Sequence, residues 1–229
     1  MAAEARFSAK EAAILANACI ASTAAGKNLS LRQLVDEKKL AEAARKAAGS
    51  FVSLKTVSKE MDDRVIKVRV TSRPPRKRYV GRAEIMYLAS ACLAKPLKLR
   101  RSARTKVYHF VSAWTKVARE GAKAPERFEL AKHFAYEPGV DFRKWMSLIE
   151  EYSETLDENV VTDPDIMGGV PTIKGTRVPV YTISALVERG SIVEEIKEDY
   201  PYLTDRAIEA AVLYARAHPR TGRKKKVFR

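Results

Sequence analysis

The sequence has few of the residues from which metal, redox and catalytic centres are built. It contains only two cysteines, Cys19 and Cys92, and each lies in an apolar, alanine-rich stretch without a second thiol nearby. Free cysteines in such surroundings are usually small core residues, so we expect neither a disulfide framework nor a zinc site. The three histidines, His109, His133 and His218, are separated from one another and from acids at metal-ligand spacing. We therefore expect no bound metal and no cofactor.

Catalytic motifs are also missing from the sequence. No catalytic triad can be identified in the sequence, and Gly168-Gly169 is not followed by the lysine that a phosphate-binding loop requires. The adjacent acids Glu150-Glu151 and Glu194-Glu195 project in different directions from a helix, which suits solvation better than acid–base catalysis. We expect a protein that is not an enzyme. An enzyme acting on nucleic acid is the alternative that the basic charge leaves open.

Long hydrophobic runs are absent as well. No stretch approaches the roughly 18 consecutive apolar residues of a membrane span, and the first residues lack the apolar core of a signal peptide. We therefore expect a cytoplasmic protein without a membrane partner. With 229 residues, 46% of them hydrophobic, the chain is long enough to form two domains.

Basic charge, in contrast, is abundant and unevenly distributed. The net charge is +15, and residues 1–125 alone carry a net +17. Within residues 64–106 there are 14 Lys and Arg against one acid, Glu84. A surface of this kind neutralises phosphates and releases their counterions, whereas a merely solvated surface usually mixes its signs. The distribution favours nucleic acid as the partner of residues 1–125, with a solvated face as the alternative.

The pattern of the first 80 residues predicts three helices followed by a basic hairpin. Ser8-Ala-Lys-Glu11 is a capping box that starts a helix, and a second amphipathic run extends from Leu29 to Ala48. Ser53 caps a third helix, which we expect to bury Leu54, Val57 and Met61. The period then becomes two, because Ile66, Val68 and Val70 alternate with Lys67, Arg69 and Thr71 as in a half-buried strand. Residues 71–78 form a polar, proline-fixed tip before the second strand.

A helix followed by a basic hairpin is the order of a winged helix-turn-helix, in which the helix enters a major groove and the wing contacts the backbone or the minor groove. We predict that duplex DNA is contacted by the polar face of the third helix, by the hairpin and by the basic cluster that follows. The predicted contacts are Lys55, Thr56, Ser58, Lys59, Arg64, Lys67, Arg69, Arg73, Arg76, Lys77, Arg78, Arg82, Arg100, Arg101 and Arg104.

A weak internal sequence similarity, called the internal echo below, suggests a duplication. Residues 6–15 resemble residues 78–87, with Arg6 aligned to Arg78. If the echo reflects a repeat, residues 78–119 form a second helical unit that extends the basic face through Arg100, Arg101, Arg104 and Lys106. Two short helices also look this similar by chance.

Residues 126–162 change to acidic character and form the predicted connection between two domains. We expect a strand near Phe128, a turn at 137–139 and an amphipathic helix from Asp141 to Leu156. On that helix an apolar stripe lies on one side, and we interpret it as packing between the two domains. The stripe consists of Trp145, Leu148, Ile149 and Tyr152.

The segment from Val160 to Val180 reads Val-Val-Thr-Asp-Pro-Asp-Ile-Met-Gly-Gly-Val-Pro-Thr-Ile-Lys-Gly-Thr-Arg-Val-Pro-Val. It resembles the domain of unknown function 433, whose pattern is Asp-Pro-x-Ile-x-Gly-Gly-x-Pro-x-Ile-x-Gly-Thr-Arg-x-Pro-Val. The resemblance covers roughly 60 residues and includes a helix at 182–189, a capping box at Ser191-Ile-Val-Glu194 and a closing helix at 204–217. It implies an antitoxin similar to those of the VapB type, paired with a small PIN-like ribonuclease toxin. In longer members, the resemblance also implies an N-terminal helix-turn-helix.

The residues of this segment are consistent with a scaffold. Gly168, Gly169 and Gly175 permit positive φ at two tight turns, and Pro171 and Pro179 stiffen short extended pieces. Behind them, three short helices are predicted to bury one trihelical, helix-turn-helix-like core: Ile183, Leu186, Val187, Ile192, Ile196, Leu203, Ile208, Ala211 and Val212.

The second of these helices displays acids, which would be repelled by phosphates, so we expect this module to contact protein or to dimerise. The acids are Glu194, Glu195, Glu198 and Asp199. The predicted organisation is thus a basic DNA-binding domain (1–125), a connection (126–162), an antitoxin-type trihelical module (163–219) and a basic tail (220–229).

The predicted assembly is a homodimer that binds operator DNA as an autorepressor and holds a PIN-like ribonuclease toxin. Arg177 either braces backbone carbonyls of its hairpin, which we favour, or pairs with a toxin carboxylate. The tail is predicted to enter the acidic pocket of the toxin, with nonspecific affinity for DNA as the alternative. Its predicted toxin contacts are Arg220, Arg223, Lys224, Lys225, Lys226, Phe228 and Arg229. A stand-alone transcriptional regulator whose C-terminal module only dimerises is the competing interpretation.

Overall fold

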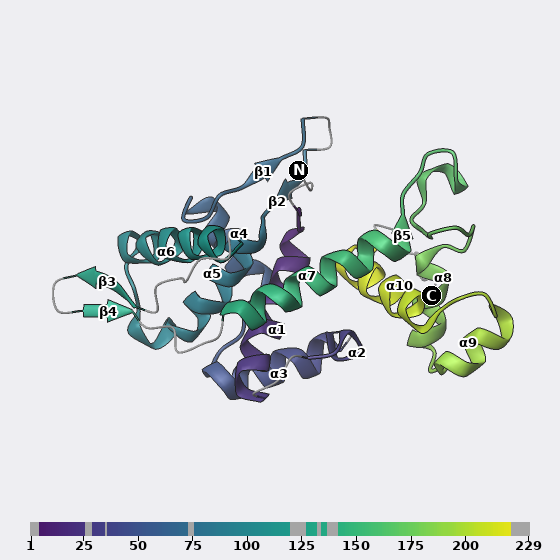
Figure 1. Ribbon diagram of the computed structural model, residues 1–229, viewed down its shortest axis with the longest axis horizontal. Helices are drawn as coiled ribbons and strands as arrows, with labels where there is room; N and C mark the ends of the chain where they lie inside the picture. The colour runs from purple at the N-terminus through teal and green to yellow at the C-terminus, as the bar shows by residue number, and fades with distance from the viewer. Residues whose placement is uncertain are drawn as a thin grey trace, which may run out of the picture. The chain divides into compact units, whose positions relative to one another are not determined.

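The structure is a computed structural model that describes residues 5–25, 29–34, 36–72, 76–119, 127–131, 134–136 and 142–220. Within these residues the protein is mainly helical, and its sheets are small, with two antiparallel strands each (Figure 1). The predicted mainly α class with short β-hairpins is therefore confirmed. The chain divides into two compact units, Met1–Ser153 and Glu154–Arg229, with the boundary inside helix α7.

The first unit contains the elements from α1 to most of α7. Its helices are α1 (Ala9–Ala25), α2 (Leu31–Leu34), α3 (Glu37–Ala48), α4 (Leu54–Asp62), α5 (Arg82–Leu93), the 3-10 helix η1 (Lys95–Leu97), α6 (Arg101–Arg119) and α7 (Phe142–Asn159). Its strands form two hairpins, β1 (Arg69–Val70) with β2 (Arg78–Tyr79) and β3 (Phe128–Ala131) with β4 (Phe134–Tyr136). The single strand predicted near Phe128 is thus a hairpin, whereas the predicted turn at 137–139 lies outside the described residues.

Helix α1 is central to the packing of the first unit. It is rich in alanine and buried from Glu11 to Ser22, and it packs against α3, α4 and α5. Small side chains let these helices approach closely. The buried amide of Asn17 donates to the Val52 carbonyl (2.9 Å) and accepts from the Val52 N–H (2.8 Å). This two-way pairing fixes the segment that leads into α4, so the position of α4 depends on α1.

Helices α1 and α5 begin in the same way. The carboxylate of Glu11 accepts a hydrogen bond from the Ser8 N–H, and the carboxylate of Glu84 accepts one from the Gly81 N–H, each at 2.7 Å. Both glutamates are buried. The capping box predicted for Ser8 is confirmed, because the Ser8 hydroxyl also accepts from the Glu11 N–H (3.2 Å). At Gly81, 73 residues later, only the glutamate half of this arrangement is present, since glycine has no side chain that could accept a hydrogen bond.

The surroundings of the two capped ends are also alike. Phe7 and Val80 pair as an antiparallel bridge and exchange two backbone hydrogen bonds of 2.9 Å. The other carboxylate oxygen of Glu11 accepts from the Tyr152 hydroxyl of α7 (3.3 Å), and the other oxygen of Glu84 accepts from the Tyr108 hydroxyl of α6 (2.7 Å). The structure therefore supports the internal echo, with a spacing one residue longer than the alignment of Arg6 with Arg78.

The Tyr108–Glu84 hydrogen bond predicts a loss of stability at high pH. Burial raises the pKa of the Tyr108 phenol, and the hydrogen bond to Glu84 and the charge of that carboxylate raise this pKa further. The folded protein therefore holds this proton more tightly than the unfolded chain does, so the stabilisation is present below about pH 10 and is lost as the pH rises above it.

We expect the unfolding temperature of the native protein to exceed that of Tyr108→Phe at neutral pH, and the difference to shrink above about pH 10. Thermal unfolding of both proteins followed by circular dichroism measures it. A difference that stays constant across that range would contradict the prediction.

Several predictions for the first unit are wrong in detail. The run from Leu29 to Ala48 is not one helix, because Asp36 caps a new helix by accepting from the Lys39 N–H at 3.1 Å. Leu54 is 49% exposed instead of buried, since it is the first residue of α4 and lies at the edge of the core. The strand at 66–71 is shortened to Arg69–Val70.

The alternation predicted for this strand is inverted at its end. Val70 is 54% exposed, whereas the guanidinium of Arg69 turns inward to within 3.6 Å of Glu84. A buried carboxylate attracts a cation more strongly than the core attracts one valine, so the charge pair sets which face is inside.

The apolar stripe on α7 belongs to the core of the first unit. Trp145, Leu148, Ile149 and Tyr152 are all buried. The Trp145 indole N–H donates to the Thr23 hydroxyl at the end of α1 (3.1 Å), and Tyr152 reaches Glu11 at its start. The stripe therefore packs on α1, and not between domains as predicted.

The second unit contains the last residues of α7 and a group of short elements. These are β5 (Val160–Val161), the 3-10 helix η2 (Met167–Gly169), β6 (Thr172–Ile173), α8 (Val180–Glu188), α9 (Val193–Asp199) and α10 (Asp205–Ala217). Strands β5 and β6 are antiparallel, and α8 packs against α10. The turns have the predicted geometry, because φ is +64° at Gly168, +79° at Gly169 and +77° at Gly175.

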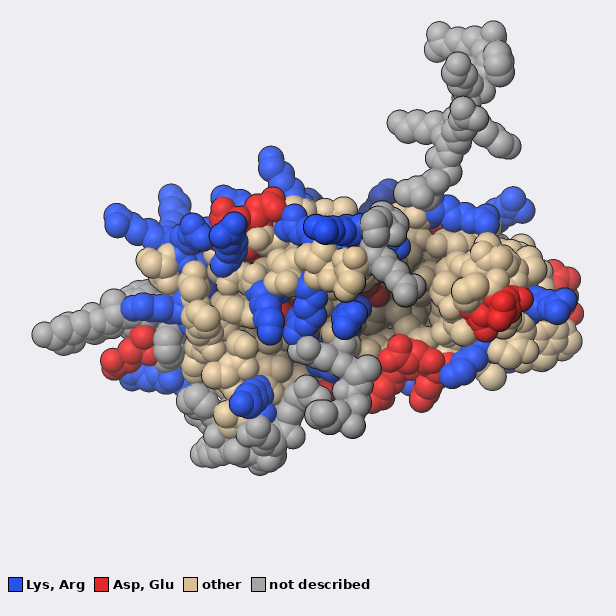
Figure 2. Space-filling model, turned by 90° about the horizontal axis from the view of Figure 1, so that it is seen from above, with Lys and Arg blue, Asp and Glu red and all other residues tan. Residues whose placement is uncertain are grey.

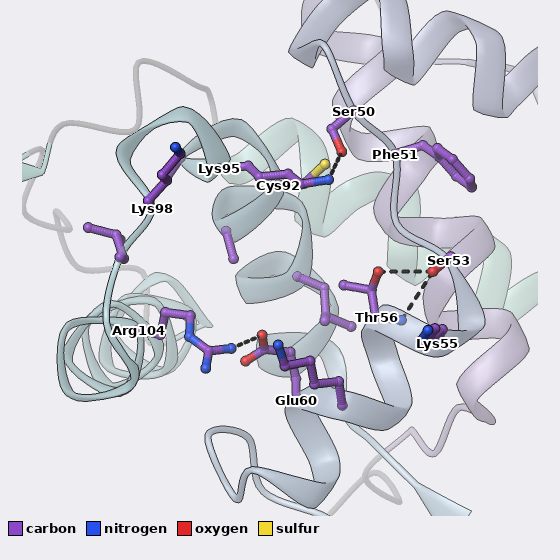
Figure 3. A pocket seen from close by; sticks show the side chains of 15 residues that line it. Ser50, Phe51, Ser53, Lys55, Thr56, Glu60, Cys92, Lys95, Lys98 and Arg104 are labelled. Atoms are coloured by element: carbon purple, nitrogen blue, oxygen red, sulfur yellow. Dashed lines mark hydrogen bonds and ion pairs between the residues drawn. The ribbon is translucent and has the colours of Figure 1, made fainter.

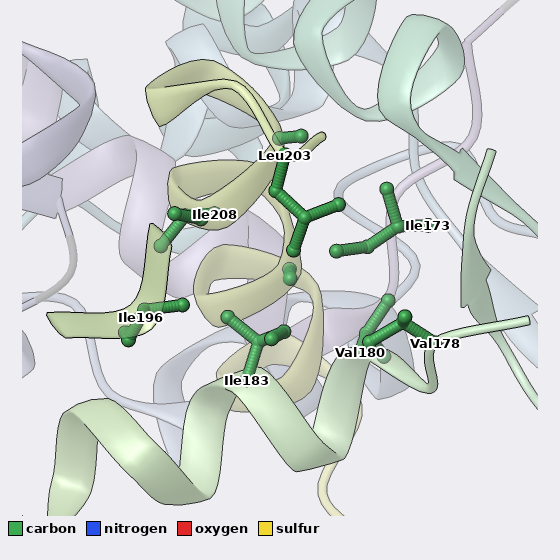
Figure 4. Packing of buried hydrophobic residues seen from close by; sticks show 9 residues of the cluster. Ile173, Val178, Val180, Ile183, Ile196, Leu203 and Ile208 are labelled. Atoms are coloured by element: carbon green, nitrogen blue, oxygen red, sulfur yellow. The ribbon is translucent and has the colours of Figure 1, made fainter. Parts of the chain in front are cut away.

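Figure 4 shows the apolar core that these elements enclose, with Ile183 from α8, Ile196 from α9 and Ile208 from α10 facing one another. Leu203, Ala211 and Val212 are also buried as predicted, while Leu186 and Val187 are only partly buried. Ile192 is 56% exposed, although it is predicted to be buried. The predicted start of the second helix of this unit is also wrong. Ile192 is the N-cap of α9, and its own N–H donates to Glu195 (3.2 Å), so the helix begins one residue later than the capping box at Ser191 predicts.

Candidate nucleic-acid interface

Helix α4 presents one buried face and one polar face. Val57 and Met61 are buried against the core of the first unit. The side chains of Lys55, Thr56, Ser58 and Lys59 are exposed, as predicted from the helical period. The Ser53 hydroxyl accepts from the Thr56 N–H at 3.1 Å and caps the helix, which fixes where this polar face begins.

The hairpin after α4 carries further exposed cations. Arg69 pairs with Tyr79 and Val70 with Arg78 in the register of β1 and β2, and the Thr71 N–H donates to the Lys77 carbonyl at 3.0 Å. Arg76, Lys77 and Arg78 are all exposed, while Arg73 lies outside the described residues. The predicted basic hairpin is therefore present between α4 and α5.

Other exposed cations flank these two elements. Arg64 and Lys67 lie between α4 and β1, and Arg100 and Arg101 lie at the start of α6. On the face of the molecule drawn in Figure 2, Lys and Arg side chains gather over the first unit.

Three of the predicted DNA contacts are used inside the protein instead. Arg69 lies 3.6 Å from Glu84, Arg82 lies 3.9 Å from Glu150, and Arg104 donates to Glu60 and to Asp63. Their side chains are only 17–20% exposed. These contacts draw the three guanidinium groups toward acids of the protein, which favours a role in the scaffold of the surface over contact with a phosphate. Arg78 is intermediate, because it is exposed but lies 2.8 Å from Asp62.

The acids that pair with these arginines were not predicted from the sequence. Glu60 is buried, and it also accepts from the Tyr87 hydroxyl at 3.0 Å. Glu60 and Asp63 are three residues apart on the end of α4, which is the only signal for their common partner. Together with Arg104 they join α4 to α6, and Tyr87 joins them to α5.

Of the predicted toxin contacts, Arg177 and Arg220 lie in the described part of the second unit. Arg177 is exposed and forms no hydrogen bond to a carbonyl within the described part of the chain, so the bracing role that we favoured is not observed. Thr176 does the bracing instead, since its hydroxyl donates to the Ile173 carbonyl (2.8 Å) and accepts from the Val178 N–H (3.1 Å).

The beginning of the tail is held by the second unit. The guanidinium of Arg220 stacks over the ring of Tyr181, 4.9 Å from its centroid. Arg223, Lys224, Lys225, Lys226, Phe228 and Arg229 lie outside the described residues. The acids predicted to face outward on α9, Glu194, Glu195, Glu198 and Asp199, are all exposed.

None of the helices described is long and apolar enough to cross a bilayer. The described residues contain no group of three or more His, Cys, Asp or Glu that could hold a metal ion.

These observations define a mainly helical protein of two units, whose first unit displays a polar helix with two exposed lysines and a basic hairpin. Residues 160–215 match the family model described as Protein of unknown function (DUF433), which supports the resemblance of the second unit. An uncharacterized protein of Sinorhizobium fredii, y4eO, is 42% identical over 86 residues, which cover 35% of this chain and 39% of that protein. The match thus spans well under half the length of the relative. No solved structure matches the chain.

Proposed function

We propose that this protein is a cytoplasmic antitoxin and autorepressor: the first unit binds operator DNA, and the second unit holds a PIN-like ribonuclease toxin. In this proposal α4 enters the major groove as the recognition helix of a winged helix-turn-helix, and the β1–β2 hairpin is its wing. The protein acts as a homodimer inside a larger toxin–antitoxin complex.

One observation carries the DNA-binding part of the proposal: some lysines and arginines of the first unit are paired with acids of the protein, whereas others are exposed without an ion pair among the described residues. The acids that approach this surface are Glu60, Asp62, Asp63 and Glu84, and they are occupied by Arg104, Arg78, Arg69 and tyrosine hydroxyls. The remaining lysines and arginines point to solvent, so their charge is left for an external polyanion. Phosphates satisfy such a surface by counterion release.

The toxin-binding part rests on the resemblance of residues 160–215 and on the charge of α9. Four exposed acids on one short helix would repel DNA, which favours a protein partner for the second unit. Exposed Met167, Ile192 and Tyr202 add apolar area of the kind that protein interfaces contain.

One pair of experiments tests the two parts separately. Fluorescence anisotropy with a duplex from the promoter of the gene measures DNA binding, and we expect the affinity to fall steeply with salt. Co-expression with the product of the adjacent gene, followed by purification and an RNA-cleavage assay, measures toxin neutralisation. No association with the duplex even in dilute buffer would refute the DNA-binding part.

The outcome with the neighbouring gene decides between the proposal and a stand-alone regulator. DNA binding by the isolated protein, with no nuclease captured or inhibited, would show that the second unit serves another role, such as dimerisation. Deleting residues 221–229 tests the tail in the same assay. We expect inhibition of the toxin to weaken, and an unchanged inhibition would refute the insertion of the tail into the toxin.

A further inference from the structure

A pocket of about 440 Å³ lies in the first unit, between α4 and the segment where α5 passes through η1 into α6 (Figure 3). Its volume falls in the range of pockets that bind small molecules. It opens on the side of the unit that carries the polar face of α4, because Lys55, Thr56 and Lys59 belong both to that face and to the pocket wall.

The wall of the pocket is strongly cationic. Five basic side chains line it, namely Lys55, Lys59, Lys95, Lys98 and Arg104. The carboxylate among the lining residues, Glu60, is neutralised by Arg104 and hydrogen-bonded by Tyr87. None of the four lysines forms an ion pair within the described residues, and Figure 3 shows the cations distributed around the pocket. An anion that enters would relieve their mutual repulsion.

One of these lysines is held in place by a neutral partner. The Lys95 ammonium donates to the Ser50 hydroxyl at 2.7 Å, and Figure 3 shows this pair beside the Cys92 thiol. Two of the three donors of that ammonium remain available to a ligand. The position of the charge is therefore set before any anion binds.

The floor of the pocket is apolar. Leu88 and Cys92 of α5 are 2% and 7% exposed, and the other apolar residues of the lining are Phe51, Ala91, Ala94 and Leu99. A bare phosphate or sulfate would leave this area without a partner. A molecule that combines phosphate groups with an aromatic or aliphatic part would use both surfaces.

We infer that this pocket binds a phosphorylated small molecule about the size of a nucleotide, with its phosphates against the lysines and its apolar part on the α5 floor. Because Lys55 and Lys59 lie in both sites, the occupied pocket withdraws them from DNA and excludes the duplex from α4. The exclusion of DNA rests on the proposed function, whereas the binding of the ligand does not.

Binding is tested with the full chain and defined probes. The four common nucleoside diphosphates are titrated separately by calorimetry, with pyrophosphate and the corresponding nucleosides as partial ligands. We expect at least one nucleoside diphosphate to bind at least about tenfold more tightly than pyrophosphate and than its own nucleoside. Equal affinity for pyrophosphate, or no binding of any of the four, would overturn the inference.

A pair of matched variants locates the binding. Lys95→Gln with Lys98→Gln removes two charges from the pocket, and Lys38→Gln with Lys46→Gln removes two exposed charges from α3. We expect the first variant to bind the probe about tenfold more weakly and the second to change less than about twofold. A similar loss in both variants would mean that the probe senses only net charge.

The cysteines give an independent readout. Cys19 is fully buried, while Cys92 lines the pocket. We expect the bound probe to slow alkylation at Cys92, and the protected signal to disappear in Cys92→Ser. Protection that persists in Lys95→Gln with Lys98→Gln would overturn the assignment of the site.

The competition with DNA is measured separately, by titrating the bound probe into a complex with labelled duplex. Displacement in the native protein but not in Lys95→Gln with Lys98→Gln supports the exclusion. Simultaneous binding of probe and duplex would refute the exclusion and leave the ligand site intact. Probe binding by a protein that binds no duplex would refute the proposed function alone.

Discussion

Replacing Arg76 and Lys77 together by glutamine is expected to weaken binding to promoter duplex about tenfold or more near physiological salt, and to lower the slope of log affinity against log salt by about 2. Both side chains are exposed on the β1–β2 hairpin, and neither forms an ion pair within the described residues. Each phosphate contact that is lost removes about one counterion from the exchange. Anisotropy titrations at several salt concentrations measure both quantities.

Arg78 is left unchanged in this variant for a structural reason. Arg78 is adjacent in sequence, but it lies 2.8 Å from Asp62 at the end of α4, so its replacement would also disturb the scaffold. The matched control is Lys38→Gln with Lys46→Gln, which removes the same charge from α3. A salt slope that falls equally in both variants would show that the hairpin has no special place in the interface. An unchanged slope in the hairpin variant would show that it is not at the phosphates.

Local signals in the sequence predicted the local features of the fold. The capping box at Ser8 and Glu11, the N-cap at Ser53 and the positive φ of Gly168, Gly169 and Gly175 are all present. Each of these depends on interactions between residues at most a few positions apart, and residue type determines such interactions. The basic hairpin was predictable for the same reason, because proline and charge mark its tip.

Features that depend on distant partners were not predictable. Glu84 is the one acid in a long basic stretch, and the sequence does not say what it binds. In the structure Glu84 caps α5 and accepts a hydrogen bond from the Tyr108 hydroxyl. It also draws the Arg69 guanidinium inward, which inverts the expected alternation of β1. Periodicity assigns a residue to a face but cannot detect a buried carboxylate on another element.

The candidate interface was also predictable only where it depends on local sequence. The exposed residues of α4 follow from its helical period, so the sequence selects them correctly. The pairing of Arg104 with Glu60 and Asp63 spans more than 40 positions, and it turns a predicted DNA contact into a structural residue. The pocket beside it was missed because its lysines come from separate elements, α4 and the segment after α5.

Arg104→Met is expected to destabilise the first unit by about 3 kcal/mol, because removing one partner leaves the buried Glu60 carboxylate without its compensating cation. We take the lower end of the range for broken buried pairs, since the Arg104 side chain is still 20% exposed. Such a loss corresponds to a fall of roughly 10 °C in the unfolding temperature of a unit of this size, which calorimetry measures. Arg101→Met is the control, since Arg101 lies exposed on the same helix, and an equal shift in both variants would contradict the prediction. Adding Glu60→Gln to Arg104→Met removes the unpaired charge and should restore part of the stability.

The same variant tests the role of Arg104 in DNA binding, at a temperature where Arg104→Met is folded. If Arg104 is a scaffold residue, the slope of log affinity against log salt stays unchanged. A slope reduced by about 1 would return Arg104 to the phosphate contacts.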